Sequence, residues 1–225
     1  MENSQNKYKT GQIRTDNRAK IIAIAEMEFA EFGYKGASIM NIAKRANMPR
    51  ANVHYYFKSK LELYKKVLTD ILQLWNQAFN QITPDDDPAD AIAAYIRAKV
   101  MYSKTNPLAS KIFANEIIHG APRINEYLNS DFRDWLRSKS AVMEHWIKQG
   151  KMDPVDPLFL IMLIWSATQH YADFSTQVNA VLGKKALTHQ DFEDIANNLT
   201  HIILKGCGIQ IKSPLISKAI NKSVN

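Results

Sequence analysis

Apolar residues recur at helical spacing through almost the whole chain, and four of the segments that carry them begin at a clear helix-start signal. These signals are Asn106-Pro107, Pro122, Asp156-Pro157 and Thr188. No run alternates apolar and polar residues beside hairpin-type turn residues. The pattern therefore predicts an all-α chain. With 225 residues, 46% of them hydrophobic, the chain can bury the core of one large domain or of two unequal ones.

The periodicity and the start signals predict nine helices, three short and six longer. We place them at about residues 15–33, 38–46, 49–57, 59–82, 88–105, 107–119, 123–150, 156–180 and 189–206. Residues 1–14 are expected to form a flexible basic arm, and the tail from Lys212 is expected to be loose. Ser59 and Glu62, three residues apart, predict a capping box at the start of the long fourth helix.

The first predicted helix has clear expected ends. Thr15 is expected to cap it, and Gly33 is expected to end it. Its apolar face is predicted to consist of Ile22, Ala25, Phe29 and Phe32.

Positive charge is concentrated at the N-terminal end of the chain. Residues 1–66 hold 13 Lys and Arg against 6 Asp and Glu, whereas residues 67–225 hold 16 of each. The whole net charge of +7 therefore lies in the first 66 residues. A basic head on a neutral body favours a polyanionic partner at the head, although a solvated basic arm without a partner would give the same count.

Several classes of protein are disfavoured by the sequence. A single cysteine, Cys207, leaves no internal disulfide and fits a reducing compartment. The polar N-terminus does not resemble a signal peptide, and the longest apolar stretch, Leu158–Ala167, is shorter than the roughly 20 residues of a membrane span. We therefore expect a cytoplasmic protein without a membrane partner.

An enzyme is also not expected. The chain has no Gly-rich phosphate loop, no nucleophile elbow and no His-Glu-x-x-His array. Its histidines are scattered without metal-ligand spacing. The sequence thus predicts no catalytic residues, no metal and no cofactor.

The most specific local pattern lies at residues 38–57 and predicts a helix-turn-helix. Ala43 supplies the small residue where two helices cross closely, and Asn47 tolerates the left-handed backbone of a sharp turn. Met48 then seals the corner, and Val53 and Tyr56 are expected to face inward from the second helix. Such a second helix can lie in the major groove of DNA.

Residues of the head match a known pattern over about positions 17–66. They are Phe32-Gly33-Tyr34, Gly36, Ser38, Ile42-Ala43, Ala46 to Pro49, Val53 to Phe57, Lys60 and Leu63. On these residues the chain resembles the TetR family of regulators, with Asn47 in place of the usual glycine and Pro49 in place of the usual serine. The resemblance implies a three-helix DNA-binding head joined to a six-helix ligand-binding and dimerisation body, which we place at residues 1–60 and 61–225.

The predicted DNA contacts divide by chemistry. Arg50, Asn52 and His54 are expected at base edges, because they lie on the outward side of the recognition helix. The phosphate contacts are predicted to be Ser38, Tyr55, Tyr56 and Lys60. Tyr56 is equally well explained as a core residue. Arm residues could steer association or enter a minor groove, and these are Lys7, Lys9, Arg14 and Arg18.

The segment 161–178 is unusually polar for a buried helix. It places Trp165, Gln169 and Asp173 on one face, with His170 beside them. A planar heterocycle would stack on Trp165 and pair with the Gln169 amide, and Trp75 could form another wall. The alternative is a polar layer in a helical dimer interface.

The body resembles the pyrimidine-responsive RutR branch of the same family. The matching residues are Trp75, Gly120-Ala121-Pro122, Asp156-Pro157, Ile164-Trp165 and Thr168 to Phe174. The resemblance implies a repressor that releases DNA on binding uracil or thymine, with Trp75, Trp165 and Gln169 around the base. The stretch 114–119 departs from that branch, and His119 in it is a further candidate for the ligand site. A hydrophobic drug or lipid effector is the alternative, and a sequence-neutral DNA binder is a more distant one.

The resemblance also implies a homodimer built on the last two long helices. The predicted interface residues are Phe192, Ile195, Leu199 and Ile202. Two-fold symmetry would space two recognition helices about 34–36 Å apart on double-stranded DNA, so the operator should be a pseudo-palindrome. Helix 59–82 is expected to connect the head, through Leu61, with the ligand site, through Trp75.

Overall fold

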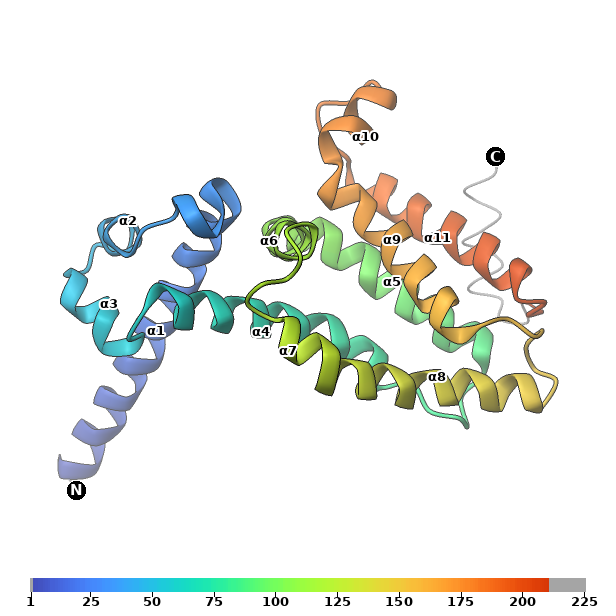
Figure 1. Cartoon of the computed structure of the whole chain (residues 1–225), viewed down its shortest axis with the longest axis horizontal. Coiled ribbons are helices and arrows are strands. Elements are labelled where there is room, and N and C mark those ends of the chain that lie inside the picture. Colours follow the sequence, from blue (N-terminus) through green and yellow to red (C-terminus); the bar gives the residue numbers. More distant parts are fainter. Residues whose placement is uncertain (1, 211–225) are drawn as a thin grey trace. The chain divides into compact units, whose positions relative to one another are not determined.

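The computed structural model describes the backbone of residues 2–210 and the side chains of residues 12–210, and this part of the chain is helical without a strand. Its helices divide into two compact units (Figure 1). The first unit contains the residues up to Leu72 together with Lys111–Arg123, and the second contains Gln73–Ser110 together with the residues from Ile124. The predicted all-α fold is confirmed. Within the described residues, no helix is long and apolar enough to cross a membrane.

The first unit is built on three N-terminal helices. They are α1 (Glu2–Gly36), α2 (Ile39–Arg45) and α3 (Arg50–Tyr56), and α4 (Lys60–Asn80) follows them. The second segment of this unit, Lys111–Arg123, contains most of α6 (Pro107–Ile118). Fully buried apolar side chains at helical spacing form its core, including Ile21, Phe29, Ile42, Val53, Phe57 and Leu63.

The start of α1 differs from the sequence prediction. The helix begins at Glu2, so Thr15 lies inside it and residues 2–14 are not a flexible arm. No proline interrupts this stretch, and a threonine inside a helix costs little. Gly33, at φ 65 and ψ 178, is not helical and ends the regular helix as predicted, and a short helical turn follows it to Gly36. Ile21 is buried where Ile22 was predicted, and Phe32 is exposed.

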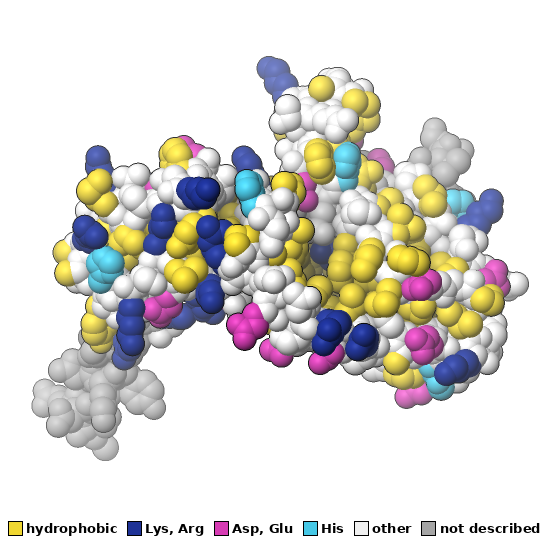
Figure 2. Space-filling model, in the orientation of Figure 1, with side chains coloured by type: hydrophobic (Ala, Val, Ile, Leu, Met, Phe, Trp, Pro, Cys, Tyr) yellow, Lys and Arg dark blue, Asp and Glu magenta, His cyan; other side chains and the backbone are white. Residues whose placement is uncertain are grey.

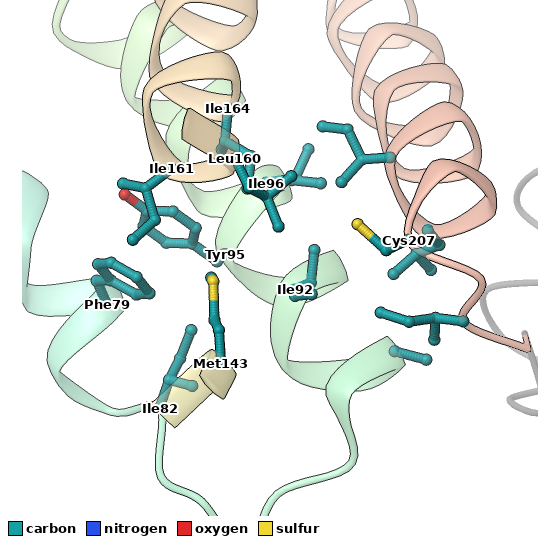
Figure 3. Packing of buried hydrophobic residues seen from close by; sticks show 14 of the residues in the cluster. Phe79, Ile82, Ile92, Tyr95, Ile96, Met143, Leu160, Ile161, Ile164 and Cys207 are labelled. Carbon is teal, nitrogen blue, oxygen red and sulfur yellow. The ribbon is translucent and has the colours of Figure 1, made fainter. Parts of the chain in front are cut away.

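The second unit is organised around α5 (Pro88–Thr105), which packs against both α9 (Pro157–Asp173) and α11 (His189–Gly206). Side chains from α4, α5, α8 (Arg133–Lys148), α9 and α11 meet in one apolar core (Figure 3). The predicted helix starts at Asp87, Asp156 and Thr188 are confirmed, because each of these side chains accepts backbone N–H groups as an N-cap. The start predicted at Pro122 is not, because the helix there begins at Asn125 without a side-chain cap.

Two predicted long helices are broken. The segment 123–150 consists of α7 (Asn125–Tyr127), the π-helix η1 (Leu128–Phe132) and α8. In it the side chains of Asn129 and Ser130 donate to the carbonyls of Asn125 and Glu126. These side-chain bonds compete with the backbone hydrogen bonds of a regular α-helix. The segment 156–180 is divided at Phe174 (φ −112, ψ 29) into α9 and α10 (Ser175–Val181).

The predicted capping box at α4 forms only in part. Ser59 Oγ accepts the backbone N–H of Glu62 at 3.1 Å, as expected. The Glu62 carboxylate accepts the N–H of Lys58 at 2.9 Å, one residue before the expected partner. The helix ends at Asn80, two residues before the predicted end.

Candidate DNA-binding surface and effector site

The turn between α2 and α3 has the geometry that its sequence predicts. Asn47 adopts φ 53, in the left-handed region, and the N–H of Met48 donates to the Ala43 carbonyl at 3.0 Å. Ser38 caps α2, with its Oγ accepting the Asn41 N–H at 3.0 Å. Pro49 is the N-cap of α3, one position before the first helical residue. The helix-turn-helix is confirmed.

A buried carboxylate fixes α2 against α1. Glu28 is 1% exposed and accepts the Ser38 backbone N–H at 3.4 Å and the Asn41 side-chain amide at 3.1 Å. Arg45 adds an ion pair to the same carboxylate at 3.0 Å. Because a buried charge needs such partners, these bonds set the position of the helix that precedes the recognition helix. The sequence did not single out Glu28.

The recognition helix α3 presents polar groups to the surface. Arg50 and Asn52 are exposed, and Arg50 Nε donates to His54 Nε2 at 3.3 Å. Tyr55 is 69% exposed, whereas Tyr56 is half-buried. Lys and Arg side chains gather over this unit on the face in Figure 2. The exposed residues of α3 are therefore free to meet DNA.

Lys60 is engaged within the protein. Its Nζ donates to the carbonyls of Ala37 at 2.9 Å and Lys35 at 3.4 Å, and it lies 4.7 Å from the ring centroid of Tyr34. An ammonium has three donors, so one remains for a phosphate. Two arginines of α1 also lie on the head, with Arg14 over the Tyr55 ring at 5.6 Å and Arg18 over Phe57 at 5.2 Å. Lys7 and Lys9 lie outside the described side chains.

The predicted effector residues Trp75 and Trp165 both lie in the second unit and contact one face of α5. The Trp165 Nε1–H donates to Tyr95 Oη at 2.5 Å, and its ring lies 5.7 Å from that of Phe132 in the π-helix. Trp75 is buried, and the Nζ of Lys99 lies 4.3 Å from its ring centroid. Tyr95 and Lys99 are one helical turn apart, so the two indoles contact neighbouring positions on α5.

Two ionisable groups lie in this region, the buried Lys99 and the half-buried Asp173. Burial lowers the pKa of Lys99 to about 7, an effect that the negative charge of Asp173 partly offsets. Burial also raises the pKa of Asp173, whereas a hydrogen bond from Ser110 and the charges of Lys99 and His170 act in the opposite direction. Lys99 was not among the residues predicted from the sequence. The signal that marks it is a lysine on the apolar stripe of α5, between Ile96 and Val100.

The other predicted ligand residues, Gln169, His170 and His119, differ in their exposure and in their contacts. Gln169 is half-buried, and its amide has no hydrogen-bond partner among the described residues. His170 is exposed and stacks on Phe174, with ring centroids 5.0 Å apart. His119 is an exposed residue of the first unit, and its Nδ1 lies 2.7 Å from the Asn115 carbonyl oxygen.

The predicted dimer residues of α11 divide between core and surface. Phe192 is buried in the core of the second unit, and Ile195 and Leu199 pack against that core. Ile202 is 64% exposed. An exposed apolar stripe on α9, not predicted from the sequence, consists of Phe159, Met162 and Leu163 at helical spacing.

Two family models together match the chain from residue 21 to residue 210. The model for "Bacterial regulatory proteins, tetR family" matches residues 21–67, and that for "YcdC-like protein, C-terminal region" matches residues 68–210. The chain belongs to the TetR family of bacterial regulators. It is therefore a DNA-binding transcriptional regulator, in agreement with its exposed recognition helix.

Among curated relatives, this regulator is 39% identical to the HTH-type transcriptional regulator RutR of Escherichia coli strain K12 over 186 residues. The alignment covers 83% of this chain and 88% of that protein. It is 27% identical to the biofilm operon icaADBC HTH-type negative transcriptional regulator IcaR of Staphylococcus aureus, covering 83% of this chain and 98% of the relative.

Solved structures share the fold of this regulator. The putative transcriptional regulator SCO4942 from Streptomyces coelicolor superposes with a TM-score of 0.69 at 22% identity, covering 86% of this chain and 99% of that one. AibR in complex with isovaleryl coenzyme A and operator DNA gives a TM-score of 0.62 at 14% identity, covering 83% and 97%.

Proposed function

We propose that this TetR-family regulator represses genes of pyrimidine or nitrogen metabolism and releases its operator when uracil or thymine binds the second unit. The observation that carries the proposal is the half-buried face of α9. It presents the Trp165 ring and the Gln169 amide, and that amide has no partner among the described residues. An amide pairs with a ring carbonyl and a ring N–H together, as uracil and thymine offer. The 39% identity to RutR supports the same ligand class.

The DNA contacts follow from exposure. In this proposal Arg50 and Asn52 reach base edges, because both are exposed on α3. Ser38, Tyr55 and the remaining donor of Lys60 bind phosphates. Replacing Asn52 with Ala should reduce affinity at its own base pair by about 1–3 kcal/mol. Removing a phosphate contact should instead weaken binding to all DNA sequences alike.

The working form in this proposal is a homodimer on a pseudo-palindromic operator. The exposed stripe of Phe159, Met162 and Leu163, with Ile202 of α11, supplies the apolar surface that a second copy would cover. Met162→Glu should give monomers in analytical ultracentrifugation, because a carboxylate would be buried unpaired at the interface. The matched control is Met40→Glu, at an exposed position of α2. A dimer that survives Met162→Glu would refute this interface.

The effector is tested with an operator selected from the protein's own genome. Fluorescence anisotropy of the labelled operator is followed while uracil, thymine or adenine is added. We expect uracil or thymine to release the DNA and adenine to have no effect. Gln169→Leu should abolish release without changing DNA affinity, whereas the exposed Gln190→Leu should behave as the wild type. No release by millimolar uracil or thymine would reject this effector class.

A further inference from the structure

Lys99 lies in a buried position, where a positive charge is energetically unfavourable. It is 3% exposed and shares the buried face of α5 with Ile92, Ile96 and Val100. Moving an ammonium out of water is unfavourable by several kcal/mol unless nearby acceptors replace the lost hydration. A lysine at this position therefore needs compensation from its surroundings.

The described residues supply little of that compensation. No carboxylate among them lies within 4.0 Å of the Lys99 ammonium, and none of them accepts a hydrogen bond from it. Its neighbours are the face of Trp75, 4.3 Å away, and the more distant charge of Asp173, whose carboxylate already accepts the Ser110 hydroxyl. The nearby Arg97 of the same helix pairs with Glu193 and Asn197 of α11. The N–H donors of Lys99 are thus left for another molecule.

The groups around Lys99 define what such a molecule must be. Trp75 offers a flat face beside the ammonium, and Trp165 is held by Tyr95 one turn earlier on α5. Flat aromatic faces select a planar ring, and an ammonium selects an electron-rich oxygen on that ring. A hydrocarbon effector would leave the ammonium unsatisfied and is disfavoured.

We propose that Lys99 is a specificity-determining residue of the effector site, which donates a hydrogen bond to a carbonyl or ionised oxygen of a planar heterocycle held against Trp75 and Trp165. The inference rests on the proposed function in placing the effector at this face. It goes beyond that function because it makes one side chain, Lys99, responsible for the class of ligand that the site accepts. Oxygen-bearing heterocycles are ligands in this account, and the same ring without oxygen is not.

The test is isothermal titration calorimetry of the full-length protein with uracil, thymine, orotate, barbiturate and unsubstituted pyrimidine. The variant is Lys99→Met, which keeps the length of the side chain and removes its donors. The control is Lys104→Met, a lysine of the same helix that bonds to His189 near the surface. We expect Lys99→Met to weaken binding of the oxygen-bearing rings by about 10- to 100-fold. Lys104→Met should remain within about twofold of the wild type, and pyrimidine should not bind.

A second variant separates recognition from folding. Lys99→Gln keeps a neutral donor and should bind with intermediate affinity. The unfolding temperature of the ligand-free Lys99→Met protein should not fall below that of the wild type, because a residue kept for its ligand is not needed for stability. A fall of many degrees in both variants would overturn the proposal by showing a structural role.

The outcomes distinguish this proposal from the proposed function. Binding of uracil that is unchanged in Lys99→Met would overturn the role of Lys99 and leave the pyrimidine effector in place. Lys99-dependent binding of orotate or barbiturate without binding of uracil or thymine would support the role of Lys99 and reject uracil and thymine as the effectors. If no heterocycle of the series binds the wild type, both are overturned.

Discussion

Replacing Arg123 with Ala should destabilise the first unit more than any other single change to its ion pairs. Glu116 is buried and accepts hydrogen bonds from Tyr64 Oη at 3.1 Å, from the Arg123 backbone N–H at 2.8 Å and from Arg123 Nη1 at 2.9 Å. The Arg123 guanidinium also lies 3.7 Å from the ring centroid of Tyr34. These contacts join α1, α4 and α6 through one side chain.

The size of the effect follows from burial. Removing one partner of a buried ion pair costs about 3–5 kcal/mol, because the other charge is left unpaired. Since the Arg123 side chain is 18% exposed, we take the lower end of this range of destabilisation, about 3 kcal/mol. For a chain of this length that is a decrease of roughly 6–12 °C in unfolding temperature.

The assay is urea unfolding of the wild type, Arg123→Ala, Glu116→Gln and the double variant. The coupling energy between the two residues should exceed about 1 kcal/mol. The control is Arg133→Ala, whose exposed ion pair with Asp134 spans 3.6 Å and should contribute less than about 0.5 kcal/mol. If Arg123→Ala changes stability no more than Arg133→Ala, the reasoning is refuted.

Three further predictions concern other buried or strained positions. The pKa of Lys99, lowered to about 7 from an ordinary 10.5, means that the unfolded chain binds more protons above pH 7. Wild-type stability should therefore rise relative to Lys99→Met between pH 7 and 9, by at most about 1.4 kcal/mol per pH unit in urea unfolding, and parallel curves would contradict this. Asn47→Val should destabilise the head by about 1–2 kcal/mol, because a β-branched residue at φ 53 is strained, whereas Asn47→Gly should change it by less than about 0.5 kcal/mol; equal stabilities of the two variants would count against the turn. Glu28→Gln should cost about 2 kcal/mol and weaken DNA binding, and unaltered circular-dichroism melting would argue against its anchoring role.

The sequence predicted the helix-turn-helix well because its signals are local. The Ser38 cap and the left-handed turn at Asn47 depend on residues within one helical turn. The breaks at Leu128–Phe132 and Phe174 were missed, since neither segment contains a proline or glycine to mark an interruption of the helix. Helix starts marked by Asp156 and Thr188 were again local signals and were found.

The candidate site was predictable only in part. The spacing of Trp165, Gln169 and Asp173 places them on one face of α9, and this spacing is visible in the sequence. The contacts of that face are not visible in the sequence, because Tyr95 and Lys99 reach it from a helix about 70 residues earlier in the chain. The apolar stripe of Phe159 and Met162 could not be told from core, since periodicity shows that a face is apolar without showing what covers it.

A crystal structure of the protein with uracil bound tests the central claim most directly. The account predicts electron density for the ring beside Trp75 and Trp165, with a ring oxygen within hydrogen-bond distance of Lys99 Nζ. A second place on the same unit provides the contrast, a groove of about 560 Å³ lined by Gln73, Asn76, Asn80 and Trp135 among others. Uracil found only in that groove, with the Lys99 ammonium unbound, would contradict the account.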